Sequence, residues 1–269
     1  MVKTFITEDG SIGLYNEKLD EIYHSKYGAK KEAFEKFVEP VLNIKNAKIL
    51  DICYGIGYNT KTALKYLDCI DFIDCIELDE ALAKNSFKYP FEDNINKIIE
   101  NNINNPDFIH FYYQDARKTI KNLNKKYNII FHDGFAPHKQ PELWSEEFIL
   151  EISKLLDKNG IYVTYNHSKP VLNALIQAGL FVGKTIKNNE YIGTIASFDH
   201  NLISNPLNDF EKETLNTKSA ITYKDKNLSL SSKEILEIRK KEIENSSLVT
   251  MSSLIKKNGN YIQNYSKNI

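Results

Sequence analysis

Four short stretches of this chain carry residue types that suit chemistry on a bound ligand. The first, Asp51-Ile-Cys-Tyr-Gly55-Ile-Gly57-Tyr-Asn59, directly follows an apolar run. Its glycines allow a tight turn and a close approach of the backbone to a ligand. A dinucleotide-binding loop would have a further glycine at position 60, where this chain has Thr60. That difference and the acidic Asp51 favour S-adenosylmethionine over NAD, because its amino-acid moiety has no pyrophosphate to seat.

Two carboxylates follow the next apolar runs. Glu77 stands 20 residues beyond Gly57, at the end of Asp74-Cys-Ile-Glu77. A carboxylate there can accept hydrogen bonds from both ribose hydroxyls of a nucleoside ligand. Asp115 can accept from the exocyclic amine of an adenine, or it can cap the helix that follows it. The two roles of Asp115 are compatible.

The fourth stretch, His132 to Trp144, combines a carboxylate, two aromatic rings and a cation in a proline-stiffened loop. We expect Asp133 to lie beside the transferred group, Phe135 and Trp144 to stack a flat base or face a cation, and Lys139 to contact phosphate or sugar. Packing of Trp144 between a helix and the sheet is an equally good interpretation. The histidines of this region have no metal-ligand spacing with acidic partners, so we predict no metal site.

Apolar strands that alternate with helices must position these residues. Strands are predicted at 48–53, 72–78, 108–113, 127–132 and 161–165, and helices at 29–42, 88–103 and through Phe148 to Leu156. A hairpin turning at Lys187-Asn-Asn-Glu190 follows, then a loop-rich linker and a capped helix from Ser231 to Asn245. The pattern predicts a doubly wound, Rossmann-like α/β fold with a parallel sheet covered on both faces. Its expected parts are an N-terminal extension and helix (1–46), the Rossmann-like core (47–199), and a linker with a basic helical tail (200–269).

Composition limits the class of protein. The chain has 269 residues, three cysteines without a CxxC pair, and a net charge of −1. No apolar stretch is long enough to span a membrane and no signal peptide is evident, so we expect a soluble cytoplasmic protein with no membrane partner. The charge argues against a strong general nucleic-acid binder, and the basic C-terminal part permits local phosphate contacts.

With these motifs the chain resembles the bacterial MnmC-type tRNA wobble-uridine methyltransferases over most of residues 4–195. The resemblance includes Thr7-Glu-Asp9-Gly10-Ser11, Tyr23-His24-Ser25, Gly28-Ala29 with Glu32, and the glycine loop. The stretch from Asp133 to Trp144 is similar to the family pattern Asp-x-Phe-x-Pro-x-Lys-x-Pro-x-x-Trp. The resemblance implies that Gly55, Gly57, Asn59, Glu77 and Asp115 hold the methyl donor and that Asp133 is the active-site carboxylate. It implies no flavin here, since the flavin-dependent oxidase domain of the fused family members has no counterpart in this chain.

The implied reaction is methylation of the aminomethyl nitrogen of 5-aminomethyl-(2-thio)uridine at tRNA position 34. The expected partners are the tRNA anticodon loop and the enzymes that install the aminomethyl group. Two alternatives remain at this level. One is an aminopropyltransferase of the spermidine-synthase type, whose pattern places a second Asp where this chain has Ala136. The other is a nucleoside-binding or RNA-binding module that keeps the fold without catalysis.

Overall fold

The computed structural model describes residues 2–257, and the chain divides into two compact units. The first unit comprises Met1–Phe135 and Lys154–Tyr165, and the second comprises Ala136–Ser153 and Asn166–Ile269. We describe each unit separately. In the described part of the chain, no helix has the length and apolarity required to cross a membrane.

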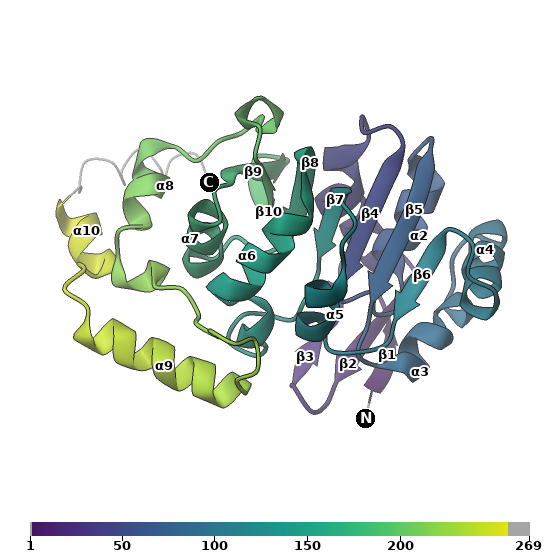
Figure 1. Cartoon of the computed structure of the whole chain (residues 1–269), viewed down its shortest axis with the longest axis horizontal. Helices are drawn as coiled ribbons and strands as arrows, with labels where there is room; N and C mark the ends of the chain where they lie inside the picture. Colours follow the sequence, from purple (N-terminus) through teal and green to yellow (C-terminus); the bar gives the residue numbers. More distant parts are fainter. Residues whose placement is uncertain (1, 258–269) are drawn as a thin grey trace. The chain divides into compact units, whose positions relative to one another are not determined.

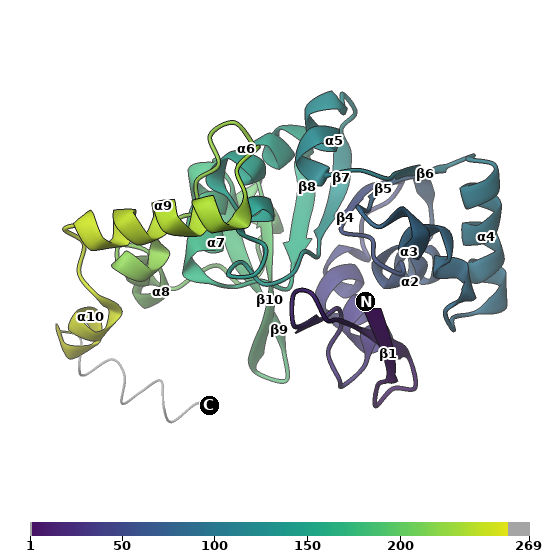
Figure 2. The same cartoon turned by 90° about the horizontal axis from the view of Figure 1, so that it is seen from below.

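A parallel sheet forms the centre of the first unit. Its strands lie in the order β6-β5-β4-β7-β8 and all neighbours are parallel. Helix α5 covers one face and α2 the other (Figures 1 and 2). This arrangement confirms the predicted doubly wound α/β fold. The bounds are β4 Ala47–Ile52, α2 Tyr58–Tyr66, β5 Ile70–Ile76, α3 Glu80–Lys84, η3 Ser86–Lys88, α4 Asp93–Asn104, β6 Ile109–Tyr112, α5 Ala116–Asn122, β7 Tyr127–His132 and β8 Leu156–Thr164.

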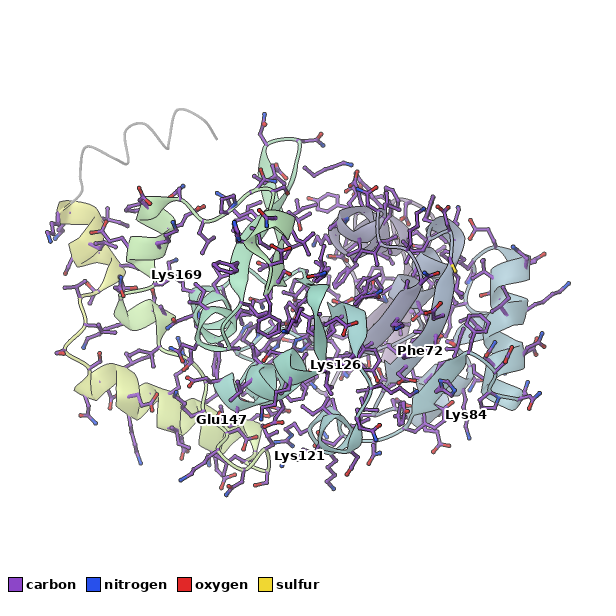
Figure 3. The ribbon with its side chains drawn as sticks, turned by 45° about the horizontal axis from the view of Figure 1, so that its top comes forward. Phe72, Lys84, Lys121, Lys126, Glu147 and Lys169 are labelled. Atoms are coloured by element: carbon purple, nitrogen blue, oxygen red, sulfur yellow. The ribbon has the colours of Figure 1, made fainter. Side chains whose placement is uncertain are left out.

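Apolar side chains of the central strands build the core of this sheet. Ile49, Leu50 and Ile52 of β4, and Ile129 to Phe131 of β7, are fully buried. Charged side chains stand on the outer helices, as Lys84 of α3 and Lys121 of α5 show (Figure 3). Burial of both strand faces explains why these segments read as continuous apolar runs.

Strand β8 begins earlier than the sequence pattern predicts. We expected a strand at 161–165, whereas β8 spans Leu156–Thr164. Tyr127 pairs with Leu156 and Ile129 with Ile161, so extra residues of β8 form a bulge opposite β7. A polar stretch that bulges out of a strand resembles a turn in the sequence.

A small antiparallel sheet at the N-terminus was not predicted. Strands β1 (Val2–Ile6), β2 (Ile12–Asn16) and β3 (Glu21–Ile22) lie in sequence order. The predicted helix at 29–42 follows, as α1 (Ala29–Glu32), a π-helical segment η1 (Ala33–Val38) and a 3-10 turn η2 (Glu39–Val41). Its last turn ends at Val41, one residue before the end of the predicted range.

The N-terminal sheet is joined to the glycine loop region by apolar contacts and hydrogen bonds. Leu14 of β2 lies in one buried cluster with Ile56 and Tyr58. The backbone N–H of Ile12 donates to the Tyr58 hydroxyl at 2.9 Å, and that of Ala29 donates to Ser11 Oγ at 2.9 Å. The first 30 residues therefore support the segment that follows β4.

The second unit contains a hairpin and several helices. Strands β9 and β10 pair antiparallel around Asn188 and Asn189, both with positive φ, which confirms the predicted hairpin. The stretch at 200–230 was expected to be mostly loop, but it contains a capped helix α8. The bounds are η4 Pro141–Leu143, α6 Glu146–Leu155 (whose last residues fall in the first unit), α7 Lys169–Gln177, β9 Phe181–Lys187, β10 Glu190–Ser197, η5 His200–Leu202, α8 Asp209–Thr214, η6 Lys218–Ala220, α9 Ser232–Asn245 and α10 Met251–Lys257.

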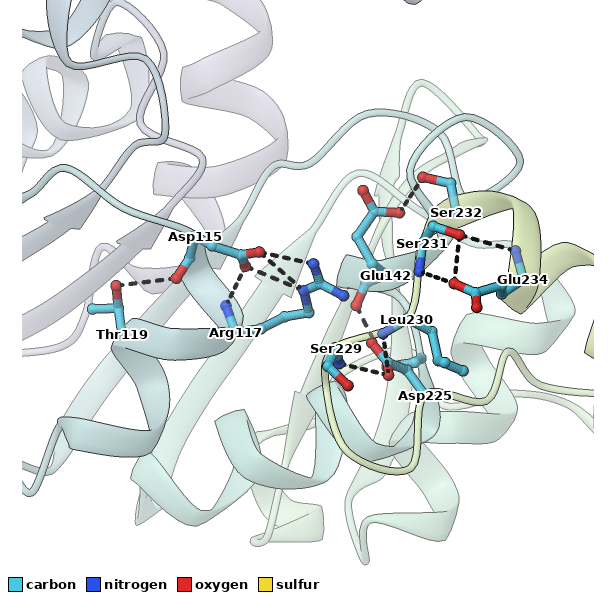
Figure 4. A network of polar contacts seen from close by, with 11 residues as sticks. Asp115, Arg117, Thr119, Glu142, Asp225, Ser229, Leu230, Ser231, Ser232 and Glu234 are labelled. Atoms are coloured by element: carbon cyan, nitrogen blue, oxygen red, sulfur yellow. Dashed lines mark hydrogen bonds and ion pairs between the residues drawn. The ribbon is translucent and has the colours of Figure 1, made fainter.

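Helix α9 begins at a capping box, as predicted. Ser231 accepts a hydrogen bond from the Glu234 backbone, and the Glu234 carboxylate accepts one from the Ser231 backbone (Figure 4). Helix α10 was not predicted as a separate element. The part of the predicted basic tail at 258–269 lies outside the described residues.

Candidate methyl-donor site

The glycine loop after β4 adopts a conformation that its glycines permit. Gly55 and Gly57 have φ values of 59° and 82°, in the left-handed region that favours glycine. A Cβ atom on Gly57 would lie 2.3 Å from the Tyr54 hydroxyl oxygen. The loop therefore keeps its shape only with glycine at position 57. Helix α2 begins directly after it, so its N-terminal N–H groups stand beside the loop.

Asp51 lies beneath this loop and is fully buried. One of its carboxylate oxygens accepts a hydrogen bond from Thr60 Oγ1 at 2.6 Å, and among the described residues the other has no partner. Burial and the nearby Glu77 carboxylate raise the pKa of Asp51 to about 7, although the Thr60 hydrogen bond works against them. Asp51 thus supports the loop through Thr60 and has one oxygen left to accept a hydrogen bond.

Glu77 follows β5 and is directly connected to the glycine loop. Its carboxylate accepts a hydrogen bond from the Gly55 backbone at 2.8 Å and one from the Asp79 backbone at 2.9 Å. Burial raises the pKa of Glu77, although the two backbone donors oppose this shift. The side chain remains partly exposed. A carboxylate held in this way is placed to accept hydrogen bonds from the hydroxyls of a ribose.

Asp133 follows β7 and is joined to the same region by Asn59. The Asn59 amide donates to Asp133 Oδ2 at 2.9 Å, and the Asp133 backbone N–H donates to the Ile52 carbonyl at 3.1 Å. Burial and the charge of Glu32 raise the pKa of Asp133 to about 8, while the Asn59 hydrogen bond and the charge of Lys36 oppose this shift. The expected active-site carboxylate therefore lies beside the glycine loop, and its pKa is well above that of an ordinary Asp.

Glu32 and Lys36 form an ion pair on the N-terminal helix. Their charged groups are 2.5 Å apart, and the second oxygen of Glu32 accepts a hydrogen bond from the Ser25 backbone at 2.8 Å. Neither residue was predicted to take part in the site. Glu32 does stand in one of the stretches that carry the family resemblance, and this was the available signal.

Phe135 lies against Tyr23, which was not predicted as a site residue. The two ring centroids are 4.8 Å apart and the rings meet edge to face at 74°. Both side chains are partly exposed. Tyr23 belongs to the Tyr23-His24-Ser25 stretch of the resemblance, but nothing in its spacing indicated a contact with Phe135.

Asp115 caps helix α5, as one of its two predicted roles requires. Its carboxylate accepts a hydrogen bond from the Arg117 backbone at 2.9 Å and pairs with the Arg117 guanidinium at 2.8 Å (Figure 4). Burial alone would raise the pKa of Asp115, but the hydrogen bonds and charge of Arg117 lower it overall. Its other predicted role, recognition of an adenine amine, stays a prediction.

Lys139 and Trp144 belong to the second unit. Lys139 is partly exposed in a turn, where its backbone N–H donates to the Ala136 carbonyl at 2.8 Å. The Trp144 side chain is fully buried. Burial supports the packing interpretation of Trp144, and we leave it out of the site proposed below.

Among residues 2–257, no group of three or more His, Cys, Asp or Glu side chains is arranged to hold a metal ion. His132, directly before Asp133, is fully buried and its Nδ1 lies 2.7 Å from the Tyr162 hydroxyl. Burial lowers the pKa of His132 to about 3, so the ring is neutral at physiological pH. We interpret His132 as a structural residue of the core.

Known proteins are similar to this chain in sequence and in fold. Residues 77–190 match a family described as S-adenosyl-L-methionine-dependent methyltransferase. An uncharacterized protein of Methanocaldococcus jannaschii is 33% identical over 257 residues, which cover 88% of this chain and 71% of that protein. The tRNA 5-methylaminomethyl-2-thiouridine biosynthesis bifunctional protein MnmC of Campylobacter hominis is 26% identical over 64% of this chain. The matched part is only 29% of that bifunctional protein.

Solved structures agree with these sequence matches. MnmC2 from Aquifex aeolicus matches with a TM-score of 0.79 and 28% identity, over 91% of this chain and 86% of that one. Spermidine synthase from Thermotoga maritima matches with a TM-score of 0.58 and 15% identity, over 96% of this chain and 84% of that one, which shows a shared fold alone. The chain therefore belongs to the MnmC-type family of S-adenosyl-L-methionine-dependent methyltransferases.

Proposed function

We propose that this protein methylates the aminomethyl nitrogen of 5-aminomethyl-(2-thio)uridine at position 34 of tRNA. The observation that carries the proposal is the position of Asp133, hydrogen-bonded to Asn59 beside the glycine loop. The names of the MnmC relatives support the choice of substrate. Because tRNA is the substrate, we expect the protein to act in the cytoplasm and to follow the enzymes that install the aminomethyl group.

The residues after β4 and β5 suit S-adenosylmethionine. The left-handed glycines shape the loop, Glu77 offers a carboxylate for the ribose, and one oxygen of Asp51 still lacks a donor. We expect Asp115 to complete the site on the adenine side. When bound, S-adenosylmethionine supplies an electrophilic methyl group whose transfer forms a C–N bond, breaks a C–S bond and leaves a neutral thioether. No flavin and no metal take part in this proposal.

Asp133 is the proposed acceptor of the proton that the substrate amine must lose before it can be methylated. An alkyl ammonium has a pKa of roughly 10 and carries no lone pair with which to attack, so it must lose a proton. An ordinary carboxylate is a poor base for this purpose. The pKa of Asp133 is raised to about 8, which brings it closer to that of the amine, and Asn59 fixes the orientation of the carboxylate. In the proposed reaction the ionised form of Asp133 orients the amine and accepts its proton.

Phe135 is the proposed contact for the base. The wobble nucleotide lies in a single-stranded loop, where a base can be splayed out and stacked on an aromatic ring. Phe135 stands two residues after Asp133 and is partly exposed. We assign Lys139 to a phosphate or sugar of the same loop.

The decisive experiment uses labelled S-adenosylmethionine and tRNA from cells that lack this gene, followed by nucleoside analysis. We expect label in the methylaminomethyl uridine and a strong loss of turnover in Asp133→Asn. Label in another nucleoside would reject the proposed substrate and keep the methyltransferase. Donor binding without transfer to tRNA that carries the aminomethyl group would favour a non-catalytic module.

The aminopropyltransferase alternative receives no support beyond the fold. The likeness to spermidine synthase is at 15% identity, and Ala136 occupies the position where that pattern has its second Asp. Production of methylthioadenosine from the decarboxylated donor would revive this alternative.

A further inference from the structure

Tyr23 joins the two sides of the proposed site. Its ring atom Cδ1 lies 3.7 Å from the position that a Cβ atom on Gly55 would occupy, so the ring lies on the glycine loop. Its ring centroid is 4.8 Å from that of Phe135, which follows Asp133. The ring is thus in contact with the donor side and with the acceptor side of the first unit.

The backbone on both sides of this ring is held in place. The Tyr23 N–H donates to the Leu14 carbonyl of β2 at 2.8 Å. Two residues later, the Ser25 N–H donates to the Glu32 carboxylate at 2.8 Å. The Tyr23 ring also packs against the buried cluster that contains Ile56 of the glycine loop. These contacts make Tyr23 a fixed part of the loop region.

The chemistry of the donor indicates what this ring faces. In S-adenosylmethionine the sulfur stands between the methionine part and the ribose. The glycine loop and Glu77 are the residues assigned to those two parts, and their direct hydrogen bond at 2.8 Å shows that they are adjacent. Burial raises the pKa of Tyr23 to about 12, and the charge of Glu77 adds to this shift although an Asn16 hydrogen bond opposes it, which agrees with a position of Tyr23 near Glu77.

We propose that Tyr23 is a donor-recognition residue whose ring favours the charged sulfonium of S-adenosylmethionine over the neutral thioether of S-adenosylhomocysteine. A cation is attracted to the electron-rich face of an aromatic ring, whereas a thioether is not attracted in the same way. Loss of the charge on methyl transfer would then weaken this contact and aid product release. The inference rests on the donor and is independent of the RNA acceptor.

The test compares the dissociation constants of the two molecules by titration calorimetry, without RNA. Tyr23→Leu keeps apolar bulk and removes the ring, and Tyr23→Phe keeps the ring and removes the hydroxyl. We expect Tyr23→Leu to weaken S-adenosylmethionine binding about 3- to 10-fold more than S-adenosylhomocysteine binding. Tyr23→Phe should keep the ratio of the two constants within about 2-fold, because both rings attract cations.

If Tyr23→Leu leaves the ratio of the two dissociation constants unchanged, either because both affinities fall equally or because neither falls, the proposal is overturned. An equal fall would show a packing role. If Tyr23→Leu does not fold, pentafluorophenylalanine at position 23 keeps the shape of the ring and withdraws electron density from its face. The same selective loss of S-adenosylmethionine affinity is then expected, and equal affinities relative to Tyr23→Phe would reject the idea. If the ratio changes as expected but no tRNA is methylated, the inference about Tyr23 stands and the proposed function fails.

Discussion

Replacement of Asp133 by Asn should stabilise the protein, and the gain should depend on pH. Burial and Glu32 raise the pKa of this carboxyl from 3.8 to about 8. Between these two values the folded state holds a proton that the unfolded state has released. Stability therefore falls as the pH rises through this window, and Asn, which cannot ionise, removes that loss.

The magnitude follows from the size of the shift. One pKa unit corresponds to about 1.4 kcal/mol, so at pH 7 the loss amounts to at most roughly 4 kcal/mol. We expect the free energy of unfolding of Asp133→Asn to exceed that of the wild type by on the order of 2 kcal/mol at pH 7. This is less than the upper limit, because local rearrangement around Asp133 lowers the destabilisation. The advantage should grow by about 1 kcal/mol per pH unit between pH 5 and pH 8.

Amide hydrogen exchange of peptides from β4 and β7, followed by mass spectrometry between pH 5 and 8, measures this difference in the first unit itself. Asp115→Asn is the matched control, because Arg117 lowers the pKa of Asp115 overall in spite of its burial. The ionised Asp115 carboxylate stabilises the folded state, whereas ionisation of Asp133 destabilises it. Asp115→Asn should therefore be less stable than the wild type at pH 7, and this difference in stability should shrink as the pH falls. A pH-independent effect of Asp133→Asn, or a loss of stability at pH 8, would refute the reasoning.

Three further substitutions test other parts of the structure. Gly57→Ala places a methyl group against Tyr54 at a backbone conformation that alanine rarely adopts, so we expect S-adenosylmethionine affinity in equilibrium dialysis to fall at least about 10-fold; normal affinity would show that the loop can rearrange. Trp144→Ala removes a fully buried side chain and should lower the free energy of unfolding by about 3–5 kcal/mol, measured by urea denaturation with circular dichroism. A loss below about 1 kcal/mol would reject its packing role. Ser231→Ala removes the capping box of α9 and should cost about 1 kcal/mol. The measurement is amide hydrogen exchange, which should become faster in the first turn of α9. Ser246→Ala, at the other end of the helix, is the control. Equal exchange of the first turn in both variants would contradict the assigned cap.

The parts of the fold that could be predicted have strong local patterns. Strands β4 and β7 are buried on both faces, so their residues form apolar runs that are visible in the sequence. The turn at Asn188 and Asn189 and the cap at Ser231 depend on residue types with known backbone preferences. These elements needed no knowledge of distant contacts.

The missed elements have weak local patterns because tertiary contacts stabilise them. The N-terminal strands alternate little, and Ile6 is 76% exposed although it ends β1. Their hydrogen bonds go to each other and to Tyr58, 46 residues after Ile12. Helices α8 and α10 are short and mostly polar, so the sequence pattern places α8 in a linker and does not separate α10 from the rest of the tail.

The candidate site could be predicted only in part for the same reason. The positions after strands identified the glycine loop, Glu77 and Asp133 as candidates, because strand ends meet at one edge of a parallel sheet. The hydrogen bond between Asn59 and Asp133 spans 74 residues and depends on β4 lying next to β7. Strand order of this kind does not follow from local periodicity, and neither does the contact between Tyr23 and Phe135.

The attachment of the N-terminal sheet to the glycine loop also affects the order in which a growing chain can fold on the ribosome. Residues 2–28 leave the exit tunnel before residues 56–82, but β2 packs against Ile56 and Tyr58, and the same buried cluster extends to Leu82. Contacts that are distant in sequence form late, since the chain between them must first be made. The N-terminal strands therefore cannot dock until residues made later have emerged, and nascent chains cut short before about residue 60 leave these strands without their packing partners.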